Sequence, residues 1–406
     1  MRRLKIGSAA ALVLIGMLSS VSAVRANTEP PAPYDARSVG MGSTGVAHVH
    51  NGASLYHNPA GLDGVEKAAF TLAIAPLAAQ TTAPLAGPET AVKSERRILP
   101  MFLVGGAYRI NERLTLGLAA YPTMGLGANY PSAPLLGGAK LNTQLRAIEI
   151  APGASFAINH TFVVGLSYRV TYMSYLVEAP QVTPAGTVVN SKTDLSGWNF
   201  LGLQLGILAR ATKTTRLGLT YRNKVTANMN GSSDGGGLSL DSKAEFSAPH
   251  SFKVGVAQLL LNERLLLAFD LKWSLYHESS KNIAVKTTIP GLGEQTQTVA
   301  LDWKNAWTAS VGAEYRLAPE GPALRTGYTL IQSATSESRV QPTTVPPGLG
   351  HAIHFGAGMS LSKLDLDLGG YYLFGGKHVQ TDGTAFPSGD YRMNALLGAV
   401  SATYRL

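Results

Sequence analysis

The 406-residue chain contains no cysteine, has few charged residues and lacks any long hydrophobic run. Without cysteine there is no disulfide framework and no thiolate chemistry, which is compatible with an oxidising compartment. Charged residues make up 15% of the chain, below the roughly 25% that is usual for soluble domains. No uninterrupted apolar stretch reaches the about 18 residues that a membrane-spanning helix needs. The sequence therefore excludes a disulfide scaffold and thiol catalysis, and it predicts no membrane helix.

The N-terminal segment has the pattern of a secretory signal. Basic residues at positions 2, 3 and 5 precede an apolar run over residues 6–18, and small residues lead to two candidate cleavage points, after Ala23 and after Ala26. This order predicts a signal peptide over residues 1–26. Cleavage after Ala26 removes four basic residues and no acidic one, which lowers the formal net charge from +9 to +5. Binding of nucleic acid then has little support, and no nucleic-acid partner is expected.

Most of the remaining chain alternates between apolar and polar residues. In residues 265–275 every odd position is a large apolar residue, whereas the even positions include Asp270 and Lys272. A period of two predicts β-strands with one apolar and one polar face. The secreted chain is also rich in glycine and tyrosine, with 44 and 16 residues. Together these features favour a barrel, because only helices and closed barrels satisfy every backbone group in lipid.

We predict an all-β fold, a transmembrane antiparallel β-barrel of 14 strands with an N-terminal plug in its lumen. The expected strands lie near residues 66–76, 97–110, 112–126, 143–159, 161–177, 194–211, 214–228, 243–260, 263–277, 297–317, 322–333, 351–361, 363–374 and 391–405. The expected organisation is a signal peptide (1–26), a plug (27–65) and the barrel (66–406).

The connections between these strands point to the location. Short turns alternate with loops of roughly a dozen or more residues, as in outer-membrane barrels with short periplasmic turns. A soluble β-sandwich shows a similar alternation of residues, but not this alternation of connections. Tyrosine and tryptophan lie mostly near strand ends, as in an interfacial girdle. We therefore expect a multi-pass β-barrel in the bacterial outer membrane.

Residues 36–62 read neither as a strand nor as a simple turn. They are rich in small residues and contain Asn58, Pro59 and Ala60 in a row, which suits compact, turn-rich backbone inside a narrow lumen. These three residues are the predicted plug or gate segment. The glycine spacing over residues 40–45 also matches a dinucleotide-binding pattern, but that mechanism needs a preceding strand, and proline-rich coil precedes it here. No cofactor is expected.

A series of short motifs follows the chain from the plug to the C-terminus. They occupy residues 58–62 (Asn-Pro-Ala-Gly-Leu), 121–130, 249–252, 270–273, 302–315, 324–328 and 364–368. Their order resembles that of the FadL/TodX family of outer-membrane transporters for hydrophobic compounds. The resemblance implies a fourteen-stranded barrel closed by an N-terminal plug. It also implies a ligand that enters from outside, binds in the lumen and leaves sideways through the wall beside the third strand.

Pro122, Gly125 and Gly127 lie where the resemblance implies this lateral opening. Proline lacks a backbone donor and glycine often marks a bend, so both weaken strand pairing. We expect an interrupted wall here, with the plug near Asn58 filling or lining the gap. An apolar molecule gains roughly 25 cal/mol per Å² on leaving water for lipid, which favours a sideways exit. The alternative is that these residues end a strand and begin a loop.

Residues 36–47 look closer to the PorV-like barrels, which serve as partners in protein secretion and surface attachment. Those relatives share the fold and the motif of residues 58–62, so the plug does not separate transport from partnership. The later-strand motifs favour transport. A PorV-like structural partner is the alternative function.

An outer-membrane enzyme is the rival from another class. It needs a nucleophile, a base and an orienting group within hydrogen-bond reach. The histidines at positions 48, 50, 57, 351 and 354 stand in neither a Gly-x-Ser-x-Gly nor a His-Glu-x-x-His setting. We predict no catalytic residues. His48 and His50 could hold a metal weakly, but hydrogen-bonded plug histidines are favoured, and no metal site is predicted.

The expected ligand is a hydrophobic small molecule, either a long-chain fatty acid or an aromatic hydrocarbon. Most charges on the polar strand faces are expected to pair across strands or to hold the plug. A carboxylate ligand needs cations that outnumber nearby acids, preferably a forked arginine. Arg325 and Lys304 are the first candidates and Arg169 is the next, whereas a hydrocarbon needs none of them. The other expected partner is outer-membrane lipid, and the chain is expected to be a monomer.

Overall fold

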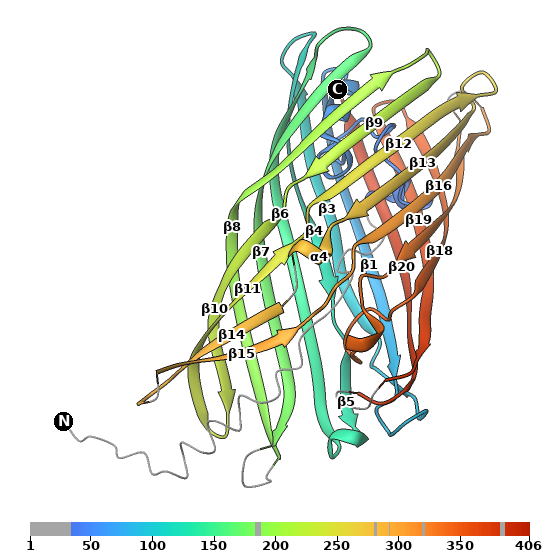
Figure 1. Ribbon diagram of the computed structural model, residues 1–406. Helices are drawn as coiled ribbons and strands as arrows, with labels where there is room; N and C mark the ends of the chain where they lie inside the picture. Colours follow the sequence, from blue (N-terminus) through green and yellow to red (C-terminus); the bar gives the residue numbers. More distant parts are fainter. Residues whose placement is uncertain (1–33, 183–187, 280–281, 292, 319–320, 382–385) are drawn as a thin grey trace.

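The computed structural model describes residues 34–182, 188–279, 282–291, 293–318, 321–381 and 386–406 (Figure 1). The predicted signal peptide and residues 27–33 of the predicted plug lie outside these residues. The described chain forms a closed antiparallel β-barrel with 14 strands in its wall. The predicted fold class and strand number are confirmed.

The wall strands pair in chain order, and the last closes on the first. They are β1 (Ala68–Ala83), β3 (Arg97–Arg109), β4 (Leu114–Leu126), β6 (Ala139–Ala157), β7 (Phe162–Val182), β8 (Val188–Arg210), β9 (Thr215–Arg222), β12 (Ser251–Leu260), β13 (Leu265–Ser274), β16 (Ala306–Arg316), β17 (Ala323–Gln332), β18 (Leu349–Leu361), β19 (Leu364–Val379) and β20 (Gly389–Arg405). The closing pair of β1 and β20 runs from Ala69↔Arg405 to Thr82↔Arg392.

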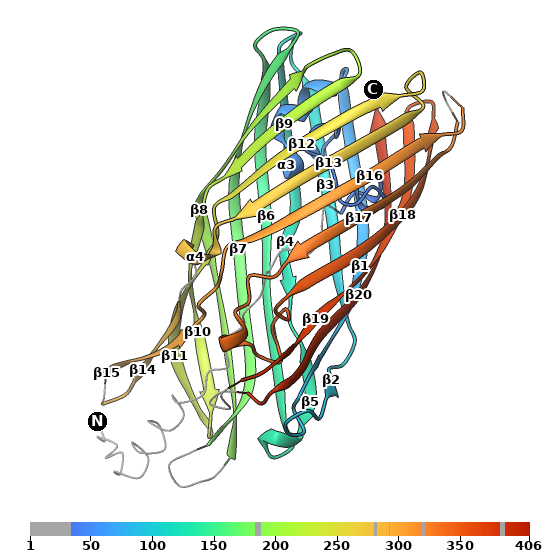
Figure 2. The ribbon, with the colours of Figure 1, turned by 45° about the vertical axis from the view of Figure 1, so that its right-hand side comes forward.

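Several strands extend beyond the wall at the end opposite the short turns. β9 and β12 lead into β10 (Val225–Gly235) and β11 (Leu238–Ala248), and a hairpin of β14 (Asn282–Ile289) and β15 (Gly293–Ala300) pairs with β11. Figures 1 and 2 show this hairpin leaning away from the barrel. The small elements are β2 (Val92–Lys93), β5 (Asn129–Ala133), α4 (Tyr276–Ser279) and the 3₁₀ turns η2 (Pro134–Leu136) and η3 (Glu337–Arg339). We call this the long-loop end, and the end that carries the C-terminus the short-turn end.

Three predicted strands are each divided in the structure. Residues 214–228 belong to β9 and β10, and residues 243–260 belong to β11 and β12. The third division is the largest. Residues 297–317 were expected as a single strand, but β15 ends at Ala300 and β16 begins at Ala306. Asp302 between them takes a left-handed backbone conformation, with φ at 46°, which a continuous strand does not allow. Trp303 then turns inward and is buried. Trp303, which the sequence placed in a strand, thus lines the lumen from a connection between strands.

The outer surface of the wall is apolar and ends in aromatic residues at two levels. Toward the long-loop end these are Tyr172, Trp198, Tyr221, Phe252, Trp273, Tyr328, Tyr372 and Phe374, and toward the short-turn end they are Phe70, Tyr108, Phe156, Phe162, Tyr315 and Tyr404. Several rings near the long-loop end contact each other across strands, such as those of Tyr172 and Trp198, whose centroids lie 5.0 Å apart. The predicted girdle is present, as in a lipid-facing barrel. Among the described residues, no helix has the length and apolar character to cross a membrane.

The N-terminal segment lies inside the barrel near the short-turn end, as the blue ribbon of Figures 1 and 2 shows. It contains the helices α2 (Ala36–Gly40) and α3 (Ser54–His57) and the 3₁₀ helix η1 (Pro59–Gly64). Asn58 caps η1, because its side chain accepts from Ala60 N and Pro59 needs no donor at the first position. This explains why the Asn-Pro-Ala run forms a compact turn.

Wall glycines let the plug backbone pack directly on the strands. A Cβ added at Gly327 would lie 2.2 Å from the amide nitrogen of Gly42, and one added at Gly312 would lie 2.2 Å from Met41 O. A side chain at either position would have to displace plug backbone. The high glycine content of the strands therefore serves, at these positions, to seat the plug.

Replacing Gly327 with alanine is expected to lower the free energy of unfolding by about 1–3 kcal/mol, the usual cost of overpacking. Gly398→Ala is the matched control, because nothing lies within 4 Å of a Cβ at Gly398. Urea unfolding of the folded barrel, followed by tryptophan fluorescence, measures both. Equal losses in the two variants would contradict a tightly seated plug.

Candidate functional site

Inward-facing side chains toward the long-loop end form a buried apolar cluster, which we call the lumen cluster. Its larger members are Leu85, Met124, Tyr130, Leu141, Leu145, Met173, Tyr175, Leu195, Met229, Phe246, Tyr276, Ile283 and Trp303. The rings of Trp303 and Tyr276 meet edge to face with centroids 5.3 Å apart. Tyr130 OH donates to Pro342 O at 3.1 Å, which ties the loop after β17 to the cluster. Methionines and aromatic rings form an adaptable apolar surface that suits a hydrophobic ligand.

Two arginines share one carboxylate where the lumen cluster meets the plug. Arg169 Nη1 lies 2.7 Å from Glu149 Oε1, and Arg222 donates to Glu149 Oε2. Arg169 Nη2 also donates to the backbone carbonyl of Asn223 at 2.8 Å. All three charged side chains are buried. One carboxylate thus faces two cations, which leaves a positive excess inside the barrel.

Two lysines extend this layer across the barrel. Lys253 and Lys272 are direct cross-strand partners on β12 and β13, where like charges destabilise a sheet. Lys253 Nζ lies 4.8 Å from the ring centroid of Tyr56 in the plug. The carboxylate of Asp270, also on β13, accepts hydrogen bonds from two plug N–H groups. We call the set Arg169, Arg222, Lys253 and Glu149 the basic floor.

The basic floor carries the three cations Arg169, Arg222 and Lys253 at the base of an apolar space, and the carboxylates there are Glu149 and the neighbouring Asp270. Burial of charge in excess of its partners is costly. An anionic group in this layer would offset part of the excess. A carboxylate fits the residues present, because arginine donates forked hydrogen bonds to it and lysine attracts it as a point charge.

The wall is incomplete between β3 and β4. In the described residues their backbone pairing ends at Val104 and Ala120. Beyond that point β3 continues to pair with β1, and β4 continues to pair with β6. Toward the long-loop end, Glu95 N donates to Asn129 O at 2.8 Å and bounds the opening. We call the stretch between residues 97–103 of β3 and 121–126 of β4 the window.

Side chains fill the window. Met101 from β3 lies against Gly125 on β4, so closely that a Cβ added at Gly125 would be 2.1 Å from Met101 Cε. Met101 is only 3% exposed. On the inner side, Tyr121 OH donates to Leu55 O of the plug at 3.2 Å, and the rings of Tyr121 and Tyr56 meet edge to face. The plug therefore reaches the window from inside.

The three residues predicted for the lateral opening all lie on the β4 side of the window. Pro122 begins a shift in the β4–β6 register that ends at Met124. Gly125 gives room to Met101, and Gly127 packs directly on β6. Because β4 continues to Leu126, the alternative that these residues end a strand holds only for Gly127.

The plug was expected to fill or line the opening near Asn58, but the Asn58 side chain is directed elsewhere. Asn58 Nδ2 donates to Val46 O at 2.9 Å and to Ile207 O of β8 at 3.0 Å, while its Oδ1 accepts from Ala60 N. The amide is used to form the turn and to hold the plug on β8. The plug reaches the window three residues earlier, through Leu55.

The predicted carboxylate-binding residues are not brought together. Arg325 lies toward the short-turn end, where it forms ion pairs with Glu314 at 2.6 Å and with Asp367 at 2.8 Å. Lys304 is exposed in the connection between β15 and β16. Arg169 belongs to the basic floor. A role for Arg325 or Lys304 in ligand binding stays a prediction, although the Arg325 side chain is already engaged by two carboxylates.

Lys253 and Arg222 also lie on polar strand faces by the period of two, but neither is among the three candidates. The sequence does not give the register of the lysine pair. A three-residue turn over residues 261–263 would put Lys253 opposite Leu271, whereas the structure pairs it with Lys272. The closeness of Arg222 to Glu149 has no local signal either, because β7 and β8 separate the two strands along the chain.

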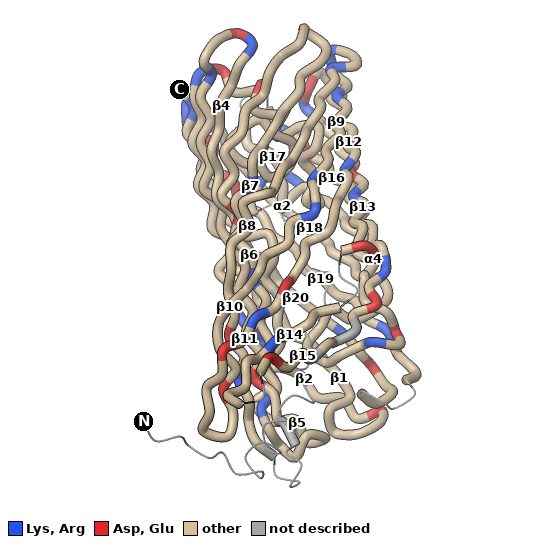
Figure 3. The backbone as a smooth tube through the Cα atoms, turned by 60° about the vertical axis from the view of Figure 1, so that its left-hand side comes forward, with Lys and Arg blue, Asp and Glu red and all other residues tan. Residues whose placement is uncertain are grey.

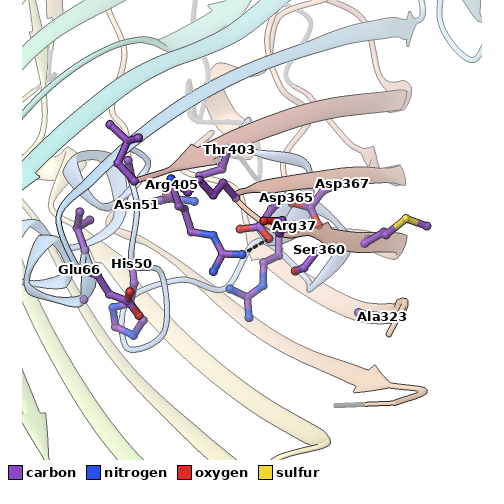
Figure 4. A pocket seen from close by; sticks show the side chains of 18 of the residues that line it. Arg37, His50, Asn51, Glu66, Ala323, Ser360, Asp365, Asp367, Thr403 and Arg405 are labelled. Atoms are coloured by element: carbon purple, nitrogen blue, oxygen red, sulfur yellow. Dashed lines mark hydrogen bonds and ion pairs between the residues drawn. The ribbon is translucent and has the colours of Figure 1, made fainter. Parts of the chain in front are cut away.

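A polar cavity of about 680 Å³ opens at the short-turn end (Figure 4). Its lining includes Arg37, Glu66, Asp365, Asp367 and Arg405, and Arg405 pairs with Asp365 at 2.7 Å. Figure 3 shows charged positions gathered at both ends of the barrel. This mouth is therefore a charged vestibule, unlike the lumen cluster.

The plug histidines are engaged by the protein. His48 shares a hydrogen bond with Thr44 Oγ1 at 3.1 Å, and His50 Nδ1 lies 3.2 Å from Gly61 O. Burial, with a contribution from Arg216, lowers the pKa of His50 to about 3, so this side chain is neutral at physiological pH. In the part of the chain that the structure describes, no group of three or more His, Cys, Asp or Glu side chains is arranged to hold a metal.

Comparison with protein families gives one match along nearly the whole chain. The family described as "Outer membrane protein transport protein (OMPP1/FadL/TodX)" matches residues 22–406. Among characterised sequences, a protein of Neisseria meningitidis serogroup B, assigned provisionally to the outer membrane, is 21% identical over 86% of this chain and 85% of its own length.

Solved structures share the fold at low sequence identity. A FadL homologue of Pseudomonas aeruginosa superposes with a TM-score of 0.76 and 16% identity over 95% of this chain and 100% of that one. The toluene transporter TodX of Pseudomonas putida gives 0.72 and 18% over 93% and 99%. The toluene transporter TbuX of Ralstonia pickettii gives 0.71 and 16% over 92% and 98%.

Proposed function

Because the chain belongs to the OMPP1/FadL/TodX family of outer-membrane transport proteins, we propose that it is a passive channel for long-chain fatty acids or amphiphiles like them. The family membership itself makes it an outer-membrane transporter of hydrophobic compounds. Its relatives are transport channels rather than enzymes. The short-turn end then faces the periplasm, as in other outer-membrane barrels.

The observation that carries the choice of ligand is the basic floor beneath the lumen cluster. A long alkyl chain matches the apolar side chains of the cluster, and a carboxylate matches the excess of cations at its base. A plain hydrocarbon, such as the toluene for which TodX and TbuX are named, would leave that excess unmatched. The juxtaposition therefore favours a ligand with an acidic head and an apolar tail.

The window supports a sideways release into lipid. Its outer surround is apolar, with Ile98 72% and Leu118 56% exposed to the membrane side. The periplasmic mouth is instead a charged vestibule. Transfer of an apolar chain from water to lipid is favourable by roughly 25 cal/mol per Å² of its surface. The window is therefore the favourable exit.

The secretion-partner alternative rested on residues 36–47. In the structure this segment forms α2 and the turns after it, and it is held by the wall, for example by Asp270 on Gly45 N at 2.8 Å. These contacts seat a plug. They offer no feature that favours a protein partner over a small ligand.

The purified chain is expected to bind oleic acid about ten- to a hundredfold more tightly than oleyl alcohol. The two share their tail, and a charge-assisted contact contributes about 1.5–3 kcal/mol, which gives this ratio. Competition against a fluorescent fatty acid measures both affinities. Equal affinities would overturn the acidic-head proposal, and preferential binding of toluene would identify a hydrocarbon channel instead.

A further inference from the structure

Met101, whose side chain fills the window, can leave it by a change of rotamer. The Met101 side chain is unbranched and flexible. It lies against Gly125, which has no side chain. The neighbouring backbones are held on their outer flanks by β1 and β6. A rotamer change of one side chain would therefore clear space between β3 and β4 without breaking any strand pairing.

We propose that Met101 is the removable closure of the window and that Gly125 is the seat it occupies. This inference rests on the proposed lateral release. The wall on both sides stays paired, and Tyr121, bonded to Leu55 O at 3.2 Å, keeps the plug at the inner rim. The moving part is then a side chain, and neither the plug nor a strand has to be displaced.

The closure also sets the shape of what passes. Protein interiors are closely packed, so a group thicker than the side chain it replaces does not fit without strain. A methionine side chain has the cross-section of an unbranched alkyl chain, so a linear tail can take its place between Leu99 and Gly125. A methyl-branched tail is thicker at each branch and meets the unyielding backbones of β3 and β4. The window therefore selects linear chains.

The test uses the full-length mature protein in lipid nanodiscs, loaded with radiolabelled palmitic acid or with its methyl-branched analogue phytanic acid. Transfer of label to acceptor vesicles is timed, and retained label measures binding. Met101→Ala is expected to speed release of palmitic acid about tenfold and to reduce the preference for the linear acid. Gly125→Val, which puts a rigid side chain at the seat of Met101, is expected to slow release about tenfold with binding intact.

Met393→Ala is the matched control. Met393 lies on β20, is partly buried against the apolar side chains inside the barrel, and pairs with Thr81 of β1, so it belongs to neither strand that borders the window. Its release rate should equal that of the wild type, and heat-modifiable migration of every variant on gels confirms a folded barrel. Unchanged release in both window variants, with normal wild-type release, overturns the closure alone. A wild-type protein that neither binds nor releases palmitic acid overturns the transport proposal and the closure with it.

Discussion

Replacing Lys253 with methionine is expected to weaken binding of oleic acid by about ten- to a hundredfold. Lys253 is interior, faces Lys272 across the strand pair and lies over the ring of Tyr56. Loss of a charge-assisted contact worth about 1.5–3 kcal/mol accounts for the size of the effect. Methionine keeps the length of the side chain, so the affinity for oleyl alcohol should not change. Competition binding with both ligands measures the difference.

Two further measurements make this result specific. Lys304→Met removes an exposed lysine that the sequence had favoured as a ligand contact, and it is expected to leave oleic acid binding unaltered. Lys253→Met also relieves a like-charge pair, so the ligand-free barrel should unfold at an equal or higher urea concentration. A loss of affinity in Lys304→Met alone would move the acidic head to the long-loop end. A loss of stability in Lys253→Met would make the lysine a structural residue.

Replacing Glu314 with glutamine is expected to lower the free energy of unfolding by about 3–5 kcal/mol, the range found when one partner of a buried ion pair is removed. Glu314 receives two hydrogen bonds from Arg37 of the plug, at 2.8 and 3.0 Å, and one from Arg325 at 2.6 Å. Glutamine preserves the shape but removes the carboxylate that pairs with Arg37, while Arg325 keeps its ion pair with Asp367. The plug then loses its strongest anchor at the short-turn end.

The same variant should pass ions. A loosened plug opens a water-filled path, so the single-channel conductance in a planar bilayer is expected to rise. Asp302→Asn is the control, because Asp302 and Arg339 form an exposed pair at 2.8 Å, and exposed pairs contribute about 0–1 kcal/mol. Equal and small changes in the two variants would mean that Arg37 does not hold the plug.

The barrel was predictable from sequence because its rules are local. Alternation in residues 265–275 exposes one face of β13 and buries the other. The short turns are readable from a few residues each. The failure at residues 297–317 has the same origin, because Trp303 has the character of a strand residue and only the conformation of Asp302 turns it into the lumen.

The site was predictable only in part. The period of two assigns Arg169, Lys253 and Arg325 alike to the polar face. It does not show how far along the barrel axis each side chain lies or which charged groups surround it. The structure separates them, since Arg325 meets Glu314 and Asp367 and is neutralised there. Lys253 meets another lysine. Which cation is in excess depends on neighbours brought together by closure of the wall.

By itself the sequence determined that the chain forms a plugged outer-membrane barrel, because side-chain alternation and turn chemistry act between residues close in the chain. The tertiary structure alone decided where the wall opens and what fills it. Pro122 and Gly125 mark a weak strand in sequence, but the window exists because β3 and β4 pair only over residues 104–109 and 115–120, and Met101 takes the space beyond. Such features depend on the register of whole strands and on packing across the lumen, which no local pattern records.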